Sequence, residues 1–213
     1  RKQDAQDAAE WNAKNEKKKI ERLIGSSLIP TRFQGKTFDS FRAEGPKQKA
    51  ALALCTDYAH NFRDHYEAGR CLLLLGNVGT GKTHLAAAIA EYLITEKSAS
   101  AVYRTVYSLM QYIKGSYDKH AEYTEAKAYA NLISPHLLII DEIGSTKTTE
   151  FEQAALFNII NGRYEEQLPT VVISNLMPGE LAGSIGERCV DRLREAGGLC
   201  QVFDWKSARK VAP

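Results

Sequence analysis

Five short apolar segments recur along the middle and end of the chain, and the sequence between them has helical periodicity. Near-continuous hydrophobic strands are typical of a parallel sheet that is covered on both faces. Apolar residues three and four apart in the intervening segments predict the covering helices. The pattern predicts an α/β domain with a doubly wound, five-stranded parallel sheet, whose ligand lies beyond the carboxyl ends of the strands. The predicted strands are Cys71 to Leu75, Ala101 to Val106, His136 to Ile140, Thr170 to Ser174 and Leu199 to Phe203.

The first 28 residues follow a different pattern. Arg1 to Ile24 is rich in Lys, Glu, Gln and Ala and has few large apolar residues, which predicts a solvated, partly frayed helix. The run Lys17 to Lys19 is typical of a solvated helix face, with contact to a nucleic-acid backbone as the alternative. We therefore expect residues 1–28 to form a charged helical linker and residues 29–213 to form one domain, with a helix near Lys47 to Tyr66.

Composition narrows the class of protein. A chain of 213 residues with 44% hydrophobic content is long enough for one well-buried core, and a net charge of +2 does not by itself indicate nucleic-acid binding. No apolar stretch approaches the roughly 20 residues of a membrane span, so we expect a cytoplasmic protein with no membrane partner. The chain starts with Arg1 rather than Met, which predicts a fragment of a longer protein. Reduced core thiols are expected at the four scattered cysteines, Cys55, Cys71, Cys189 and Cys200.

The segment behind the first predicted strand carries the strongest chemical signal. Residues 76–83 fit the pattern G-x-x-x-x-G-K-[ST] without a mismatch, and a chance match is disfavoured because the required strand and helix flank them. In such a P-loop, backbone N–H groups surround the phosphates, Lys82 reaches the β/γ oxygens, and Thr83 takes a place on Mg²⁺. The helix His84 to Thr95 points its positive end at the same anion. We predict a site for ATP or ADP with Mg²⁺ at Gly76, Asn77, Val78, Gly79, Thr80, Gly81, Lys82, Thr83 and His84.

Two acids end the third predicted strand, in the form of a Walker B motif. Strand ends often carry solvated carboxylates, but downstream of a P-loop the hydrolytic interpretation is favoured. Asp141 is predicted to hold the Mg²⁺ shell, and Glu142 to orient and deprotonate the attacking water.

Two further groups are candidates for contact with the γ-phosphate. Asn175 ends the fourth predicted strand, where its amide could hydrogen-bond the phosphate or the lytic water; the alternative is that it opens a turn before Pro178. Arg188 and Arg192 lie four apart on a short predicted helix and could deliver a guanidinium to the phosphate of a neighbouring subunit. Salt-bridged surface arginines remain the alternative for this pair.

In their order along the chain, these motifs resemble the AAA+ domain of bacterial and phage DnaC-type replicative helicase loaders. The resemblance covers about Phe33 to Arg209 and is carried by GNVGTGKTHLAAAIA, LLIIDEIG, VVISN and GERCVDRLR, followed by a final strand and the tail Trp205 to Arg209. It implies a P-loop NTPase core of AAA+ type. The chain stops soon after the fifth strand, which leaves no room for the C-terminal helical lid of most AAA+ proteins and is similar to the loader group.

The resemblance also implies partners and roles. Loaders of this family bind ATP, assemble side by side as homo-oligomers, hold single-stranded DNA, and use an N-terminal extension to grip a hexameric replicative helicase. By this resemblance, we expect the gripping domain to lie upstream of these residues, with the Lys-rich helix before Ile24 as a remnant of it. By resemblance, Asn175 occupies the sensor 1 position and Arg192 that of the arginine finger, with Arg188 as a second candidate.

DNA contacts are assigned by the same resemblance to Lys114 to Tyr117 and to Thr149 to Phe151. The candidates are therefore Lys114, Tyr117, Thr149 and Phe151. Lys114 and Tyr117 are three residues apart and would share one helical face, which pairs a phosphate partner with a stacking ring. Most of the tyrosines between residues 103 and 129 are expected to pack against the core instead.

Three functions fit these motifs. The first is an ATPase that loads a replicative helicase onto single-stranded DNA when replication starts, with ATP binding and hydrolysis as the switch. The second is an IstB-like ATPase that helps DNA transposition, binding duplex DNA and a transposase. The third is a nucleotide kinase, for which no lid arginines are recognisable after Glu142.

Overall fold

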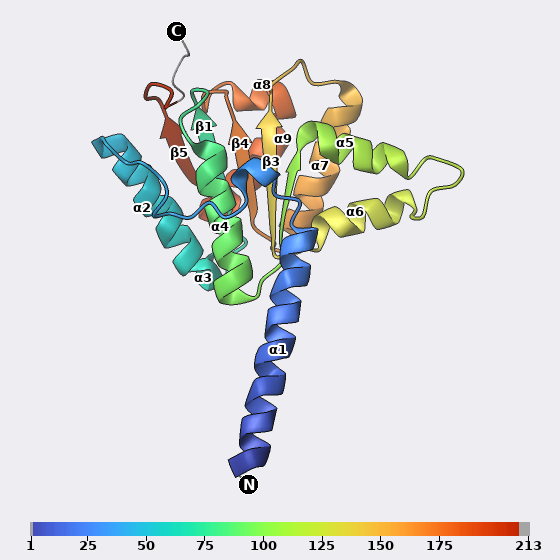
Figure 1. Ribbon diagram of the computed structural model, residues 1–213. Coiled ribbons are helices and arrows are strands. Elements are labelled where there is room, and N and C mark those ends of the chain that lie inside the picture. Colours follow the sequence, from blue (N-terminus) through green and yellow to red (C-terminus); the bar gives the residue numbers. More distant parts are fainter. Residues whose placement is uncertain (1, 209–213) are drawn as a thin grey trace.

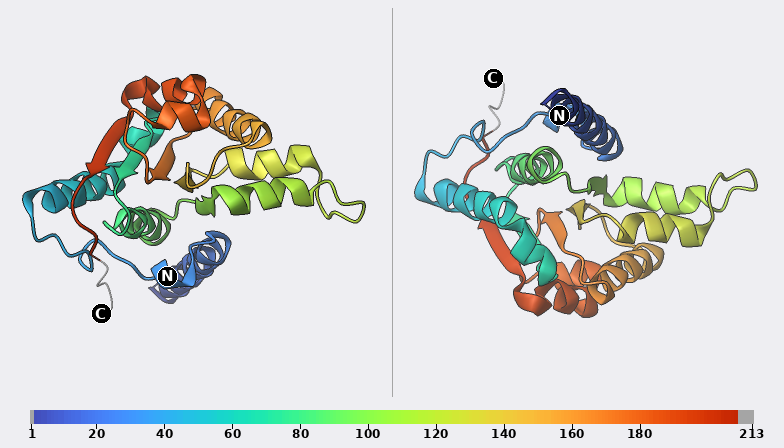
Figure 2. Two further views of the ribbon diagram at one scale, coloured as in Figure 1. Left: turned by 90° about the horizontal axis from the view of Figure 1, so that it is seen from above. Right: turned by 90° about the horizontal axis from the view of Figure 1, so that it is seen from below.

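The computed structural model describes residues 2–208, with side chains from residue 11 onward. A central five-stranded sheet carries helices on both faces (Figure 1, Figure 2). Its strands pair in parallel in the order β2-β3-β4-β1-β5. The elements are α1 Lys2–Ser26, η1 Thr31–Phe33, α2 Pro46–His60, α3 Phe62–Glu67, β1 Leu72–Gly76, α4 Lys82–Lys97, β2 Ala101–Thr105, α5 Val106–Gly115, α6 Glu125–Ile133, β3 Leu137–Ile143, α7 Glu150–Glu165, β4 Thr170–Ser174, α8 Leu181–Ile185, α9 Glu187–Arg194, η2 Glu195–Gly197 and β5 Leu199–Phe203.

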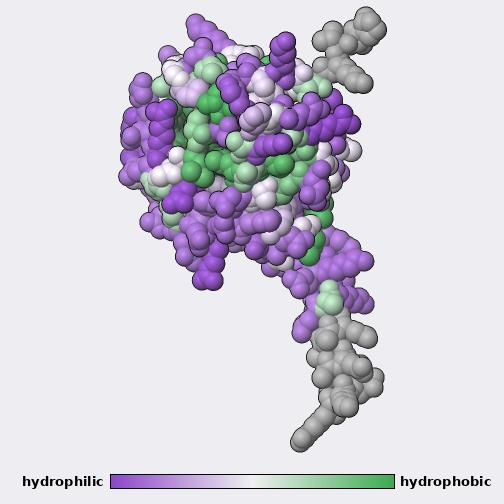
Figure 3. Space-filling model, turned by 90° about the vertical axis from the view of Figure 1, so that its left-hand side faces the viewer, coloured by the Kyte–Doolittle hydropathy of each residue, from purple (hydrophilic) through white to green (hydrophobic). Residues whose placement is uncertain are grey.

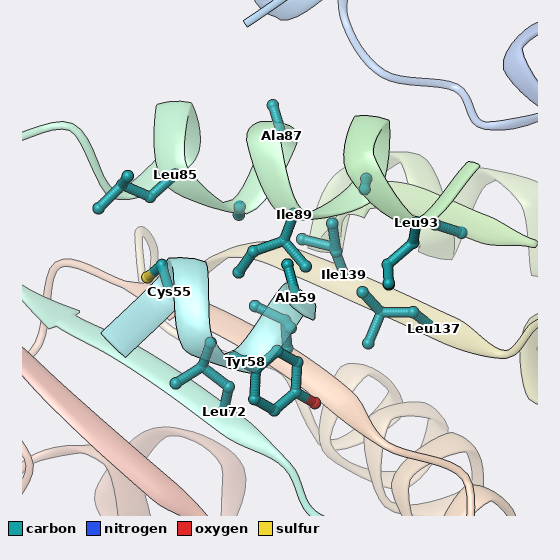
Figure 4. Packing of buried hydrophobic residues seen from close by; sticks show 14 of the residues in the cluster. Cys55, Tyr58, Ala59, Leu72, Leu85, Ala87, Ile89, Leu93, Leu137 and Ile139 are labelled. Atoms are coloured by element: carbon teal, nitrogen blue, oxygen red, sulfur yellow. The ribbon is translucent and has the colours of Figure 1, made fainter. Parts of the chain in front are cut away.

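The predicted doubly wound sheet is confirmed. Alternate residues of each central strand enter two separate hydrophobic clusters, because successive side chains of a strand point to opposite faces. One cluster lies between the sheet and α2 and α4, and the other between the sheet and α5 to α9. In Figure 4, Ile89 and Leu93 point from α4 toward Ile139 and Leu137 of β3, with Tyr58 of α2 alongside.

The strand boundaries match the prediction at β4 and β5, differ by one residue at both ends of β1 and at the end of β2, and differ most at β3. The prediction ended β3 at Ile140, but the strand continues to Ile143 through the two acids. Its pairing with β4 shifts register between Ile140 and Ile143. A bulge of this kind re-aims side chains at the end of a strand.

The helix predicted near Lys47 to Tyr66 is divided in two. Asn61 lies between α2 and α3 with φ −97° and ψ 25°, outside the helical region, and its side chain donates to Asp57 Oδ1 at 2.7 Å. Asn favours such helix ends because its side chain competes for local hydrogen bonds. The two helices stay together through the stacked rings of Tyr58 and His65, whose centroids are 4.5 Å apart.

α1 projects away from the rounded body of the molecule (Figure 1). Its described side chains are mostly exposed, which agrees with a solvated helix, and only Ile20 and Leu23 pack against the core. Figure 3 shows a mostly hydrophilic surface on α1 with a few apolar atoms where it leaves the body, and a larger group of apolar residues on the body itself. Just after α1, Ser27 O accepts a hydrogen bond from Tyr103 N of β2 at 2.7 Å, which joins the base of the helix to the sheet.

α5 and α6 form a hairpin that projects from one side of the body (Figure 1, Figure 2). Tyr112 and Tyr123 hold it together, because their rings stack at 4.7 Å and Tyr123 Oη donates to Tyr112 O at 2.8 Å. Of the six tyrosines between residues 103 and 129, Tyr103 is buried in the core, Tyr112 and Tyr129 pack against it, and Tyr107 and Tyr117 are exposed. The expectation that most of them pack against the core is therefore met by only three of the six.

The cysteine prediction is wrong at one position. Cys55, Cys71 and Cys189 are buried free thiols, but Cys200 is exposed. It lies on β5, an edge strand that pairs with another strand, β1, on one side only. Among the described residues, no helix is long and apolar enough to cross a membrane.

Candidate nucleotide-binding site

The P-loop connects the end of β1 to the start of α4 at the carboxyl edge of the sheet. Gly76, Gly79 and Gly81 all have positive φ angles, of 118°, 74° and 99°, which residues with a Cβ adopt only under strain. A Cβ on Gly76 would also lie 2.6 Å from Phe203 O. The glycines of the pattern are therefore required by the backbone. Lys82 and Thr83 open α4, two residues before the predicted start at His84.

Lys82 is buried, and its ammonium group is hydrogen-bonded to the loop and to Asn175, the residue after β4. Its Nζ donates to Gly76 O at 2.7 Å, Asn77 O at 2.6 Å and Asn175 Oδ1 at 3.0 Å. The contact with Asn175 brings the candidate sensor at the end of β4 next to the P-loop lysine. A turn-opening role alone does not account for this position of the Asn175 amide.

The two acids differ in environment. Asp141 is buried, and its Oδ2 accepts hydrogen bonds from Thr83 Oγ1 at 2.9 Å and from Tyr103 Oη at 2.5 Å. Glu142 is exposed and has a φ of 65°, in the left-handed region. Its N–H donates to Asp141 Oδ1 at 2.6 Å, at the bulge of β3. The two adjacent acids thus differ in burial, since Asp141 is enclosed and Glu142 is open to solvent.

Tyr103 is a member of this site that the sequence analysis missed. Burial and the adjacent Asp141 carboxylate raise the pKa of its phenol, which therefore stays protonated and donates. Tyr103 is in register with Ile139, two residues before Asp141 on the neighbouring strand. Its contact depends on strand register, for which the sequence alone contained no signal.

A pocket of about 300 Å³ joins these groups. It is at the small end of the range for ligand pockets. Its lining includes Val78 to His84 of the P-loop segment, together with Asp141, Glu142 and Asn175. Arg32 and Phe33 of η1 complete it from outside the sheet, and neither was predicted.

Three residues predicted to contact the nucleotide, Gly76, Asn77 and His84, make hydrogen bonds to other parts of the protein. Gly76 and Asn77 lie behind the loop, where their carbonyl oxygens accept from Lys82. His84 lines the pocket, but its Nε2 lies 3.1 Å from Ser40 Oγ and 3.0 Å from Thr37 O. The His84 ring therefore ties the segment before α2 to the start of α4.

A hydroxyl and a carboxylate at contact distance are suitable donors for Mg²⁺, which prefers hard oxygen ligands. Thr83 and Asp141 provide such a pair, as predicted. Among the described residues, no group of three or more His, Cys, Asp or Glu is clustered as a metal site. The pair therefore fits an ion that is also held by the phosphates of a nucleotide.

The two candidate arginine fingers do not line the pocket of their own chain. The Arg188 guanidinium lies 4.3 Å from the centroid of the Phe157 ring, and that of Arg192 lies 4.3 Å from the Tyr164 ring. Arg192 also pairs with Glu195 at 3.2 Å. Both are thus held on the surface of α9 by contacts with α7 and η2.

The four candidate DNA contacts divide into two kinds. Lys114 and Tyr117 are exposed, but Tyr117 lies beyond the end of α5 at Gly115, so the predicted shared helical face is wrong. Tyr117 Oη donates to Glu125 Oε1 at 2.8 Å across the hairpin. Phe151 packs against the core with Lys114 Nζ 5.3 Å from its ring centroid.

Thr149 caps α7, with its side chain accepting from Glu152 N while Glu152 Oε2 accepts from Thr149 N. The spacing of Thr149 and Glu152 is that of a capping box, a signal present in the sequence and overlooked. The Thr149 hydroxyl therefore has a structural use at the start of α7.

The comparisons with known proteins agree with this geometry. Residues 9–191 match the family model described as IstB-like ATP binding protein. The chain is 34% identical over 197 residues to "Replicative helicase loader DnaC" of Buchnera aphidicola subsp. Baizongia pistaciae, covering 92% of this chain and 78% of the relative. It belongs to the DnaC-type group of the IstB-like ATP-binding family. The DnaC of Escherichia coli (strain K12) is 29% identical over 202 residues, covering 95% of this chain and 80% of the relative.

Solved structures support the fold of this family member. The crystal structure of the DnaC helicase loader matches with a TM-score of 0.73 at 23% identity, over 82% of this chain and all of that one (100%). The replication initiator DnaA bound to AMPPCP and single-stranded DNA matches with a TM-score of 0.68 at 20% identity, over 84% of this chain and 52% of that one. The predicted AAA+ P-loop fold is therefore confirmed, and the chain is a member of a P-loop ATPase family.

Proposed function

We propose that this protein is an ATP-dependent loader of a hexameric replicative DNA helicase onto single-stranded DNA at the start of replication. The observation that carries the proposal is the 34% identity, across 92% of the chain, to a relative named replicative helicase loader. A cytoplasmic location follows from such a function. The nucleotide-binding site supplies the switch, because ATP and ADP differ at the γ-phosphate. Lys82, Glu142 and Asn175 line one pocket, where they could distinguish the two nucleotides.

ATP hydrolysis is proposed to proceed by attack of water on the γ-phosphate. Thr83 and Asp141 would hold Mg²⁺, which when bound would supply charge stabilisation for the phosphate oxygens. Glu142 accepts a proton from the water while the water oxygen bonds to the γ-phosphorus. The bond from that phosphorus to the ADP oxygen breaks, which releases ADP and phosphate. Hydrogen bonds from Thr83 and Tyr103 fix the buried Asp141 carboxylate. Glu142 is exposed and lines the pocket, where its carboxylate can reach a water molecule.

The helicase contact is proposed to involve a region that precedes residue 29, including α1. α1 projects from the body with exposed side chains, and Ser27 joins its base to β2 (Figure 1). The test is co-purification of the full-length protein with its host's hexameric replicative helicase, with and without ATP, using Lys82→Ala as the nucleotide-free control. ATP-dependent capture is expected. Bending of duplex DNA without any helicase capture would instead favour a helper of transposition.

The active form is proposed to be a homo-oligomer in which Arg192 of one subunit contacts the γ-phosphate of the next. Arg192→Ala should lower ATP hydrolysis at least tenfold, because a guanidinium supplied in trans stabilises transition-state charge. Mixing Arg192→Ala with Lys82→Ala protein should restore part of the hydrolysis, since some interfaces then combine an intact pocket with an intact arginine. The control is Arg194→Ala, an exposed arginine on the same helix. Mixtures that remain inactive would indicate that Arg192 has only a structural role, in its surface ion pair with Glu195.

Single-stranded DNA is proposed to contact the exposed end of the α5–α6 hairpin at Lys114 and Tyr117. Tyr117→Ala should weaken binding of an oligonucleotide by about 1–3 kcal/mol, because one base loses its stacking partner. Tyr117→Phe is the matched control, since it keeps the ring and removes only the hydroxyl that bonds Glu125. Fluorescence anisotropy measures both affinities. Equal loss in the two variants would argue for the Glu125 contact and against stacking.

A further inference from the structure

The segment that follows β5 lies against the P-loop. β5 pairs in parallel with β1 so that Phe203 is in register with Gly76, and Asn77 N donates to Phe203 O at 2.8 Å. The chain therefore leaves the sheet beside the residue at which the P-loop begins. Residues 204–208, which we call the C-terminal clasp, continue along that loop.

The clasp makes hydrogen bonds to three residues of the P-loop. Trp205 Nε1 donates to Thr80 O at 3.2 Å, and Ala208 N donates to Gly79 O at 2.9 Å. In the other direction, Asn77 Nδ2 donates to Trp205 O at 3.2 Å. Two successive carbonyl groups of the loop are thus held by donors from the end of the chain.

The clasp is itself anchored to the core. The Trp205 ring packs on the fully buried Phe203, with ring centroids 4.7 Å apart. Asp204 forms an ion pair with Lys47 at the start of α2. These contacts fix Trp205 relative to the sheet, so its N–H can act as a fixed donor to the loop.

Holding those carbonyl groups also orients the neighbouring amides. In a trans peptide the C=O of one residue and the N–H of the next lie in one plane and point in opposite directions. The bond to Gly79 O therefore orients the N–H of Thr80, and the bond to Thr80 O orients the N–H of Gly81. Gly79 and Gly81 are permissive residues whose peptide units rotate easily without such contacts. Amide groups of this loop are the ones that face phosphates.

We propose that Trp205 and the Ala208 N–H are positioning groups for the P-loop, and that the C-terminal clasp sets nucleotide affinity by orienting the loop amides. The proposal requires the nucleotide binding shared by the family but neither hydrolysis nor helicase loading.

The test removes each donor separately. Trp205→Phe keeps a ring against Phe203 but deletes the indole N–H, and Ala208→Pro deletes the backbone N–H, since proline has none. Each should weaken ADP binding about fivefold, the scale of one lost hydrogen bond, when measured by calorimetry without Mg²⁺. Ala208→Gly, which retains its N–H, should bind ADP like the wild-type protein.

Two further measurements distinguish positioning from stability. The thermal unfolding midpoint without nucleotide should stay within about 2 °C of wild type, and KM for ATP should rise while kcat changes less than about twofold. Unchanged ADP affinity in both donor variants would overturn the proposal, as would a loss of affinity that occurs equally in Ala208→Gly. Absence of ATP hydrolysis in the wild-type protein would count against the proposed function but leave the ADP measurement valid.

Discussion

Glu142→Gln should lower the rate of ATP hydrolysis about 100-fold or more while ATP affinity changes less than about twofold. A positioned general base contributes roughly 10²- to 10⁴-fold, and glutamine cannot accept the proton. Affinity should be retained because the groups proposed to hold the phosphates and the metal, Lys82, Thr83 and Asp141, are untouched. Phosphate release under single-turnover conditions measures the rate, and calorimetry measures the affinity.

The matched control for this substitution is Glu150→Gln, which removes an exposed carboxylate from the first turn of α7. It should hydrolyse ATP at the wild-type rate. Turnover in Glu142→Gln that equals that of Glu150→Gln would remove Glu142 from the mechanism. A loss of both hydrolysis and affinity in Glu142→Gln would instead indicate that the carboxylate acts in binding.

The backbone at Glu142 is itself an argument for its role. A non-glycine residue at φ 65° costs about 1–3 kcal/mol and persists only where the surroundings impose it. Here the bulge after Ile140 and the hydrogen bond from Glu142 N to Asp141 Oδ1 hold the residue in place. The strain separates the exposed Glu142 carboxyl from the buried Asp141 carboxyl, so adjacent acids can serve different tasks.

Local patterns in the sequence predicted most of the sheet and the P-loop. Strand β4 and strand β5 are continuous apolar runs, and the glycines at 76, 79 and 81 are required by backbone angles that only a short segment determines. Such features depend on near neighbours, and a single sequence contains that information.

Features that depend on tertiary register were not predictable. Tyr103 reaches Asp141 because β2 and β3 pair in a particular register, and Phe33 enters the pocket because the chain before α2 folds back over α4. Trp205 was recognised only as part of a tail, without its bond to Thr80. Tyr117 was placed on a helix that ends before it, since helix boundaries are the least certain part of a periodic pattern.

A second large effect is expected on stability, at Arg163 of α7. This guanidinium is fully buried, and no salt bridge to a carboxylate is found for it among the described residues. Burial lowers its pKa to about 10, which still leaves it charged at neutral pH. Its charge is compensated by oxygen acceptors at the amino ends of β3 and β4, namely Ile133 O at 2.5 Å, Pro135 O at 2.9 Å, Pro169 O at 2.5 Å and Thr170 Oγ1 at 3.0 Å.

Arg163→Met should lower the free energy of unfolding by about 3–5 kcal/mol. Methionine fills a similar volume and removes the cost of burying a charge, but it leaves several buried carbonyl groups without a donor, each costing about 1–3 kcal/mol. The second effect is larger because one guanidinium satisfies at least four acceptors at once. Arg163→Lys should lose less, since it keeps the charge and up to three donors.

Urea unfolding at 25 °C measures these differences, with Arg194→Met as the exposed control. The loss should be the same at pH 6 and pH 8, because Arg163 is protonated in the folded and unfolded chain throughout that range. A stabilised Arg163→Met protein would mean that desolvation of the charge outweighs its hydrogen bonds. Because the acceptors belong to the segments that lead into β3 and β4, loss of Arg163 should also loosen β3, which carries Asp141, and β4, which Asn175 follows. ATP affinity should therefore fall along with stability.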